Sequence, residues 1–174
     1  IQLGEVNLAV AGGVESMSRS TFSSAMPRFG ARMGNFELND DMLAALHDPF
    51  GAGHMGVTAE NVAEQFGIDR EAQDVFAVES HTRAINAIEK GYFKEQIVPV
   101  EIKSRKGVTV FDRDEHARAD ASVDGMSGLK PAFKKEGSVT AGNASGLNDG
   151  AAAIILASES WAKENGKAPL AKII

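Results

Sequence analysis

The residues Val139–Ala153 carry the densest set of groups suited to ligand binding in this sequence. They read V-T-A-G-N-A-S-G-L-N-D-G-A-A-A, in which glycines are interleaved with asparagine, serine and aspartate. Glycine allows a positive φ and a close approach of the backbone to a ligand, and small polar side chains offer hydrogen bonds with little bulk. An apolar, strand-like run follows at 151–157. The segment therefore predicts one wall of a binding site, and an ordinary turn between two elements is the alternative.

The four histidines are the next candidates for chemistry. His54 lies in G-H-M-G, directly before a predicted helix, where an imidazole can donate or accept a hydrogen bond with a ligand. His47, His81 and His116 lie in or beside charged segments, and we interpret them as surface or structural residues. No pair of histidines has the spacing of a metal site with a matching carboxylate, so no metal is expected.

The sequence offers no visible catalyst beside this binding surface. It contains no cysteine, which excludes disulfides, thiolate metal sites and a cysteine nucleophile within this chain. The serines do not stand in a G-x-S-x-G frame, so no nucleophilic serine is expected. A G-x-G-x-x-G fingerprint is expected to be absent as well, so no dinucleotide site is expected. Scattered basic residues are able to meet phosphate: Arg105, Lys106, Arg113, Arg118 and Lys130.

Composition narrows the class of protein further. The 174 residues are 43% hydrophobic, enough for one sizeable core or for one domain with part of another. A net charge of −6 without a long basic run argues against nucleic-acid binding, which needs clustered Lys and Arg. The longest apolar run, 151–157, is far too short to span a bilayer. We expect a cytoplasmic location.

Several elements must position these residues. A buried strand is predicted at Val6–Ala11, ending at Gly12 and Gly13, and a long irregular stretch follows at 18–39. Its Phe and Met residues suggest packing against another subunit, with a loop that covers the core as the alternative. Helices are predicted at 40–47, at 58–66 with Thr58 as N-cap, at 70–90 with Asp69 as N-cap, and from Ser158 to near Gly166; a hairpin at 97–103 and 108–111; a helical turn at 122–128; and strands at 151–157 and 169–174.

The order of these elements indicates an α/β layered domain interrupted by an insertion of roughly 17–148. On the helix at 70–90, a stripe at helical spacing is predicted to be core: Ala72, Phe76, Ser80, Ala84, Ala87 and Ile88. Strand-like segments at both ends suggest an internal piece of a longer protein, because natural domains usually end in exposed, polar sequence. An unusually trimmed small domain is the alternative.

Four ordered motifs give the chain a family resemblance. They are A-G-G-V-E-S-M-S at Ala11–Ser18, G-H-M-G-V-T-A-E-N-V-A at Gly53–Ala63, R-E-A-Q-D-V-F-A at Arg70–Ala77, and the run at Val139–Ala153. Together they resemble the thiolases, with the nearest likeness to acetyl-CoA acetyltransferases and bacterial β-ketothiolases. The resemblance covers essentially the whole chain. The histidine of G-H-M-G favours the acetoacetyl-CoA type over long-chain degradative thiolases.

The resemblance implies a fold and a domain organisation. Thiolases are more than twice this long and join two α/β/α halves, with a loop domain inserted in the first. The chain is therefore expected to be α/β, a fragment of this layered fold with an inserted α+β loop domain. Residues 1–17 would end the first half, 18–148 would form the loop domain with a tetramerisation loop at about 21–37, and 149–174 would return to the first half.

The resemblance also implies a reaction. Thiolases catalyse the reversible Claisen condensation of two acetyl- or acyl-CoA molecules to a 3-ketoacyl-CoA, such as acetoacetyl-CoA, and free CoA. The nucleophilic cysteine, the second cysteine, the histidine of a G-H-P motif and the asparagine of an N-E-A-F motif would all lie outside this chain, which would be inactive alone. No cofactor is expected, CoA being a substrate, and the full protein would be a homotetramer. A non-catalytic, thiolase-like protein that binds acyl-CoA or lipid is the alternative.

By similarity, the chain would supply the CoA side of the site. Ser145 would hydrogen-bond the pantetheine with Ala144 and Gly146 beside it, His54 would also face the pantetheine, and Arg118 would lie near the adenine and its phosphates. Met55 would line the acyl pocket. The remaining channel residues would be Leu46, Met126, Ala132, Phe133, Ala141 and Leu147.

Overall fold

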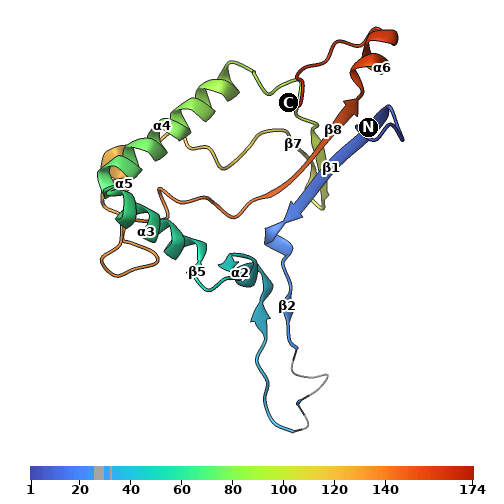
Figure 1. Cartoon of the computed structure of the whole chain (residues 1–174). Helices are drawn as coiled ribbons and strands as arrows, with labels where there is room; N and C mark the ends of the chain where they lie inside the picture. The colour runs from blue at the N-terminus through green and yellow to red at the C-terminus, as the bar shows by residue number, and fades with distance from the viewer. Residues whose placement is uncertain (26–29, 32) are drawn as a thin grey trace. The chain divides into compact units, whose positions relative to one another are not determined.

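The computed structural model describes residues 1–25, 30–31 and 33–174 of the chain. Internal contacts divide it into two compact units (Figure 1). One unit combines the two ends of the chain, Ile1–Ser20 and Leu147–Ile174, and the other is the segment Thr21–Gly146. Their correspondence to a thiolase half and an inserted loop domain stays a prediction.

A two-stranded antiparallel ribbon forms the unit made by the chain ends. Strand β1, Leu8–Ser16, pairs with β8, Asp149–Ala157, from Leu8 opposite Ala157 to Ser16 opposite Asp149 (Figure 1). The prediction that the first strand ends at Gly12 is wrong, because β1 continues through both glycines. A Cβ on Gly12 would lie 2.9 Å from the carbonyl oxygen of Ala152, so glycine is what allows the strands to approach there.

Both predicted strands of this ribbon are more exposed than expected. Val10, Val14 and Ile155 are 76%, 79% and 74% exposed, so the prediction of buried strands is wrong for this chain. The physical reason is that a two-stranded ribbon has no second layer against which to bury either face. The predicted strand at 169–174 is also wrong, because these residues adopt no regular structure.

The ribbon is flanked by two short helical elements. The 3₁₀ turn η1, Met17–Arg19, follows β1, and helix α6, Glu159–Glu164, follows β8. Ser158 caps α6 as predicted, its hydroxyl accepting the Trp161 N–H at 3.3 Å.

The unit Thr21–Gly146 begins with small elements. Strand β2, Phe22–Ser23, pairs antiparallel with β3, Asn39–Asp40. Strand β4, His47–Asp48, pairs antiparallel with β5, Gly53–His54, so that His47 lies opposite His54. The predicted helix at 40–47 is present but ends earlier, with Asp40 as its N-cap. This helix is α2, Asp41–Ala45.

Two longer helices follow, α3 at Met55–Phe66 and α4 at Arg70–Glu89. The prediction of Thr58 as the N-cap of α3 is wrong, because His54 holds that position and Thr58 lies in the first turn, where its hydroxyl bonds the Met55 carbonyl. Asp69 caps α4 as predicted, through a 2.8 Å hydrogen bond from the Ala72 N–H. Gly67 ends α3 in the left-handed conformation that suits glycine.

The predicted core stripe on α4 is wrong. Phe76 is 77% exposed, and the buried residues of the helix are Asp74 and Ile85. Apolar residues occupy consecutive positions from Val75 to Val78, so spacing alone does not select one face. The buried face instead follows the polar contacts of Asp74, described below.

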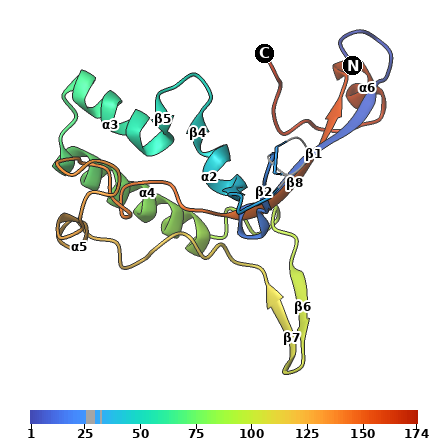
Figure 2. The same ribbon diagram turned by 90° about the horizontal axis from the view of Figure 1, so that it is seen from below.

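The remaining elements are a hairpin and a short helix. Strand β6, Val100–Ser104, pairs with β7, Gly107–Phe111, around the predicted turn, and the hairpin stands apart from α3 and α4 in Figure 2. Helix α5, Val123–Ser127, is capped by Ser122 and buries Met126.

The expected tetramerisation loop at 21–37 is only partly within the described residues. Met26 and Phe29 lie outside them. Phe22, Met33 and Phe36 are 64%, 97% and 50% exposed. None of the helices in the described part of the chain is long and apolar enough to span a bilayer.

Candidate functional site

The carboxylate of Glu60 holds the start of the Val139–Ala153 segment. Glu60 lies in α3 and is only 4% exposed. Its oxygens accept hydrogen bonds from the Ser138 N–H at 2.9 and 3.0 Å, the Ser138 hydroxyl at 3.1 Å and the Val139 N–H at 2.9 Å. Such charge-assisted bonds satisfy a buried carboxylate and fix two successive peptide units.

A second buried carboxylate holds the turn that follows at residues 141–143. Asp74 in α4 is 1% exposed and accepts a 2.9 Å hydrogen bond from the Asn143 amide. Its other oxygen accepts from the Arg70 Nε at 2.7 Å, and Arg70 also donates to the Met126 carbonyl in α5. This chain of contacts joins α5, α4 and the turn.

The Asn143 side chain also closes the turn on itself. Its Oδ1 accepts the Thr140 N–H at 2.8 Å, and its Nδ2 donates to the Ser138 carbonyl at 3.0 Å. Thr140 is fully buried. A Cβ on Gly142 would lie 2.6 Å from Leu129, so this glycine allows the turn to seat against the segment after α5. The turn before Ser145 is therefore fixed by side chains from two helices, α3 and α4, and by its own Asn143.

His54 stands at the N-terminus of α3, between a ring and a backbone group. Its Nδ1 accepts the Gly56 N–H at 3.0 Å, so Nε2 remains for another partner. The ring stacks on Phe133 with centroids 4.8 Å apart, and the His47 ring meets it edge-on at 5.4 Å. A side chain on Gly56 would run into the Phe133 ring. The predicted residues His54 and Phe133 are thus in contact, and His47, interpreted as a surface or structural residue, adjoins them.

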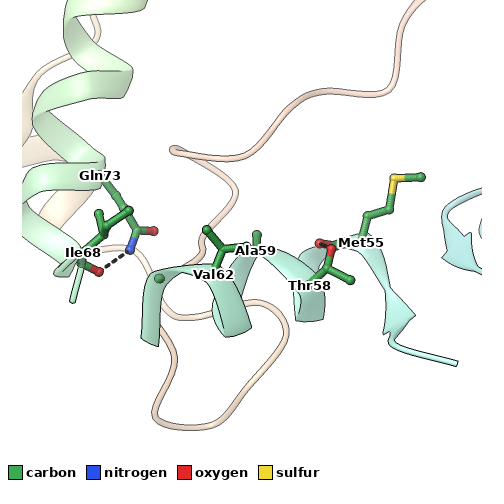
Figure 3. A pocket seen from close by; sticks show the side chains of 7 residues that line it. Met55, Thr58, Ala59, Val62, Ile68 and Gln73 are labelled. Atoms are coloured by element: carbon green, nitrogen blue, oxygen red, sulfur yellow. Dashed lines mark hydrogen bonds between the residues drawn. The ribbon is translucent and has the colours of Figure 1, made fainter. Parts of the chain in front are cut away.

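Met55 joins this group to an apolar hollow. The Met55 N–H donates to the Leu46 carbonyl at 2.8 Å, which ties α3 to the end of α2. Figure 3 shows the hollow along one face of α3, and of the predicted site residues only Met55 lines it. Its lining residues are Met55, Thr58, Ala59, Val62, Ala63, Ile68 and Gln73.

The other predicted site residues differ in exposure. Met126 is buried, whereas Ala132, Ala141, Ser145 and Gly146 are exposed, and Ala144 is half-buried. The Ala132 N–H donates to the buried Val139 at its carbonyl, 2.9 Å away, so the strand-like segment at 131–132 runs beside the turn. Ser145 thus presents an accessible hydroxyl.

Leu147 and Arg118 are the two remaining predicted site residues. Leu147 belongs to the unit formed by the chain ends and is 57% exposed. Arg118 is exposed, and its guanidinium forms a two-bond ion pair with Asp120, at 3.1 and 2.9 Å. The backbone N–H of Arg118 donates to Nδ1 of the His81 ring. The hydrogen bond and charge of Asp120 hold the pKa of Arg118 above its ordinary value.

The expectation that no G-x-G-x-x-G spacing is present is wrong, because residues Gly51–Gly56 read G-A-G-H-M-G. A dinucleotide fingerprint follows a strand of a parallel sheet and opens a crossover helix. Here the two-residue strand β5 lies inside the motif and pairs antiparallel with β4. Gly51 and Gly53 have φ values of 102° and 86°, which explains them as turn residues. The structure gives this spacing no dinucleotide frame.

Sequence reasoning missed Glu60, Asp74 and Arg70 as parts of the site. The Arg70–Asp74 pair has the four-residue spacing of a helical ion pair, a signal that was available. Glu60 offered no signal, because its partners lie 78 and 79 residues away in the sequence.

The comparison with family models identifies the protein class. Residues 1–160 match the model described as Thiolase, N-terminal domain. The chain belongs to the thiolase family, and the expectation of a fragment of the thiolase fold is confirmed.

Individual relatives sharpen this result. The chain is 55% identical to the β-ketothiolase BktB of Cupriavidus necator, over 100% of this chain and 44% of that protein. The crystal structure of the Bacillus anthracis acetyl-CoA acetyltransferase superposes with a TM-score of 0.90 at 53% identity, covering 98% of this chain and 43% of the other. Human mitochondrial 3-ketoacyl-CoA thiolase in complex with CoA gives a TM-score of 0.85 at 38% identity, covering 97% and 42%. The chain thus spans less than half the length of the relatives it matches.

Proposed function

We propose that this chain is the CoA-binding segment of a thiolase that catalyses the reversible Claisen condensation of acetyl- or acyl-CoA. The observation that carries the proposal is the match of the whole chain to acetyl-CoA acetyltransferases and β-ketothiolases. A relative described in complex with CoA supports the ligand. The relatives' names also favour acetoacetyl-CoA as the product.

The residues divide the work of binding. Ser145, beside Ala144 and Gly146, donates to or accepts from the pantetheine amides. The Nε2 of His54 also faces the pantetheine, and the Phe133 ring and the Gly56 N–H hold the imidazole in place. Met55 contributes apolar surface for the acyl group, and Arg118 meets phosphate. Leu46, Met126, Ala132, Phe133, Ala141 and Leu147 line the channel.

The reacting groups come from outside the chain in this proposal. Claisen condensation through an acyl-enzyme needs a thiolate nucleophile, and the chain has no cysteine. An enolate also needs donors placed for its oxygen. The 174 residues alone are therefore inactive, and the full-length protein supplies two cysteines, a histidine and an asparagine. It works in the cytoplasm without a further cofactor.

A homotetramer is proposed for the full-length protein. Phe22, Met33 and Phe36 expose apolar surface along the segment 21–37, where the family resemblance puts the tetramerisation loop. Sedimentation equilibrium checks the state directly. A dimer that is unchanged by Phe36→Ser would contradict the assignment.

Thiolysis of acetoacetyl-CoA by the full-length protein tests the activity, with calorimetric titration of CoA measuring binding. Turnover is expected for the full-length protein and none for the 174 residues alone. Ser145→Ala should weaken CoA binding by roughly five- to tenfold, the loss of about one hydrogen bond. Ser160→Ala, an exposed serine in α6, is the matched control. An unaltered affinity in Ser145→Ala would remove that residue from the site.

The same experiment separates the alternative, a non-catalytic thiolase-like protein that binds acyl-CoA or lipid. The absence of cysteine from this chain is the observation that favours this alternative. CoA binding without turnover in the full-length protein would favour it.

A further inference from the structure

Asn143 is the residue through which the helices reach the Ser145 segment. Both polar atoms of its side chain are engaged within the chain: Oδ1 accepts from Thr140, and Nδ2 donates to Asp74 and to the Ser138 carbonyl. Two residues later, Ser145 is exposed. The amide therefore ties a rigid part of the unit to an accessible loop.

The partner carboxylate is held just as firmly. Asp74 is 1% exposed, and its second oxygen is engaged by Arg70, which is itself bonded to the Met126 carbonyl at 2.5 Å. Glu60 fixes the opposite arm of the turn at Ser138. A buried network with every member satisfied holds one geometry, because any other leaves a polar group unpaired.

We propose that Asn143 is a positioning residue for CoA binding, and that its amide bond to Asp74 sets the place of the Ala144–Gly146 segment against the pantetheine. The inference rests on the proposed CoA-binding function of Ser145. It adds a requirement that the function alone does not make: the amide at 143 must donate to a carboxylate on α4. A loop held only by its own turn geometry would lack this requirement.

Asn143→Asp is the sharpest test, because it changes the Nδ2 group, which donates to Asp74 and to the Ser138 carbonyl, into an acceptor at constant size. The new carboxylate would face Asp74 at the 2.9 Å of the present amide bond, and where both carboxylates are ionised they repel each other and no hydrogen bond joins them. Arg70 is the cation beside Asp74, and Glu60 lies across the turn at Ser138. At low pH one carboxyl is protonated, and its O–H donates in place of the amide.

The measurements are made on the full-length protein. The KM for CoA in thiolysis should rise roughly tenfold at pH 8 in Asn143→Asp, from the loss of a hydrogen bond to a charged group. The ratio of this KM to that of the unchanged protein should fall towards one at pH 6, while kcat changes less than KM. At pH 8, hydrogen–deuterium exchange of the Ala144–Gly146 amides should be faster in Asn143→Asp than in the unchanged protein. Asn86→Asp, the same change at an exposed position of α4, should alter none of these values.

A reciprocal exchange guards against a variant that fails to fold. Asp74→Asn combined with Asn143→Asp restores one amide-to-carboxylate hydrogen bond, and its KM should lie closer to that of the unchanged protein than the KM of Asn143→Asp does. A KM within twofold of the unchanged protein in Asn143→Asp, or faster exchange without a change in KM, would overturn the inference. Absence of CoA binding in the unchanged protein would instead contradict the proposed function.

Discussion

Glu60 and Val139 are joined across 79 residues of sequence by a buried hydrogen bond of 2.9 Å. Glu60 belongs to the helix that begins beside His54, and Val139 begins the segment that leads to Ser145. The bond therefore couples the two groups proposed to face the pantetheine. A helix carboxylate, rather than a ligand-facing side chain, sets their spacing.

Replacing Glu60 with Gln should destabilise this unit strongly. Gln keeps the size but places an amide donor where the Ser138 and Val139 N–H groups already donate. The loss of charge-assisted bonds with a buried donor left unpaired costs about 2–4 kcal/mol. Urea unfolding followed by circular dichroism measures the free energy of unfolding. Glu64→Gln on the same helix, where the side chain is 81% exposed and 3.6 Å from Lys134, is the control and should change stability by less than about 0.5 kcal/mol.

The stability that Glu60 provides should depend on pH. Burial acts to raise the pKa of its carboxyl, but hydrogen bonds from Ser138 and Val139 and the charge of Lys134 outweigh burial, and the pKa lies below its ordinary value of 4.5. The folded chain then binds fewer protons at this group than the unfolded chain. Its contribution is complete above pH 4.5 and is lost as the pH falls through the lowered pKa.

Exposed carboxyls with lowered pKa values, such as Glu159 at about 2, contribute to acid unfolding as well. The informative quantity is therefore the difference in unfolding free energy between the unchanged protein and Glu60→Gln. This difference should be constant from pH 7 to 5 and shrink below pH 4.5. A difference that does not vary with pH would show that Glu60 does not titrate as the hydrogen bonds imply.

The sequence predicted local features well where the deciding interactions are local. Asp69 and Ser158 cap the helices that follow them, and the β6–β7 hairpin turns between the two predicted strands. A cap or a turn depends on neighbours within a few residues, so residue type and spacing suffice.

Burial was less predictable, because it depends on distant partners. The apolar Phe76 is exposed, while the charged Asp74 beside it is buried, since Asn143 and Arg70 supply its hydrogen bonds. The spacing of residues in α4 does not predict that Asp74 bonds Asn143, which lies 69 residues away in the sequence. The candidate site behaves in the same way: the motifs indicated His54 and Ser145 as candidates, and the carboxylates of Glu60 and Asp74 became visible only in the fold.

Gly56→Ala should disrupt the His54 group. The added Cβ would run into the Phe133 ring, which stacks on His54. Overpacking of this kind costs about 1–3 kcal/mol, and the displaced ring releases the His54 imidazole from its present orientation. Thermal unfolding gives the stability change, and the imidazole proton resonances of His54 report the ring. Gly128→Ala, where a Cβ meets open space at a φ of −76°, should be neutral or slightly stabilising. Equal stability of the two variants would contradict the packing argument.

Arg118 should contribute to CoA affinity through charge alone. Its guanidinium is exposed and already paired with Asp120, so a phosphate would have to share or replace that partner. Arg118→Gln is expected to weaken CoA binding by roughly two- to fivefold at low salt, the size of an exposed ion pair, and the loss should fade at high ionic strength because salt screens exposed charges. Asp120→Asn, which frees the guanidinium, should strengthen binding over the same range. Calorimetric titration at two salt concentrations measures both, with Arg83→Gln on α4 as the control for an exposed, paired arginine. An Arg118→Gln effect that is independent of salt, or an Asp120→Asn variant that binds CoA more weakly, would show that the pair acts by holding the chain around His81 rather than by meeting phosphate.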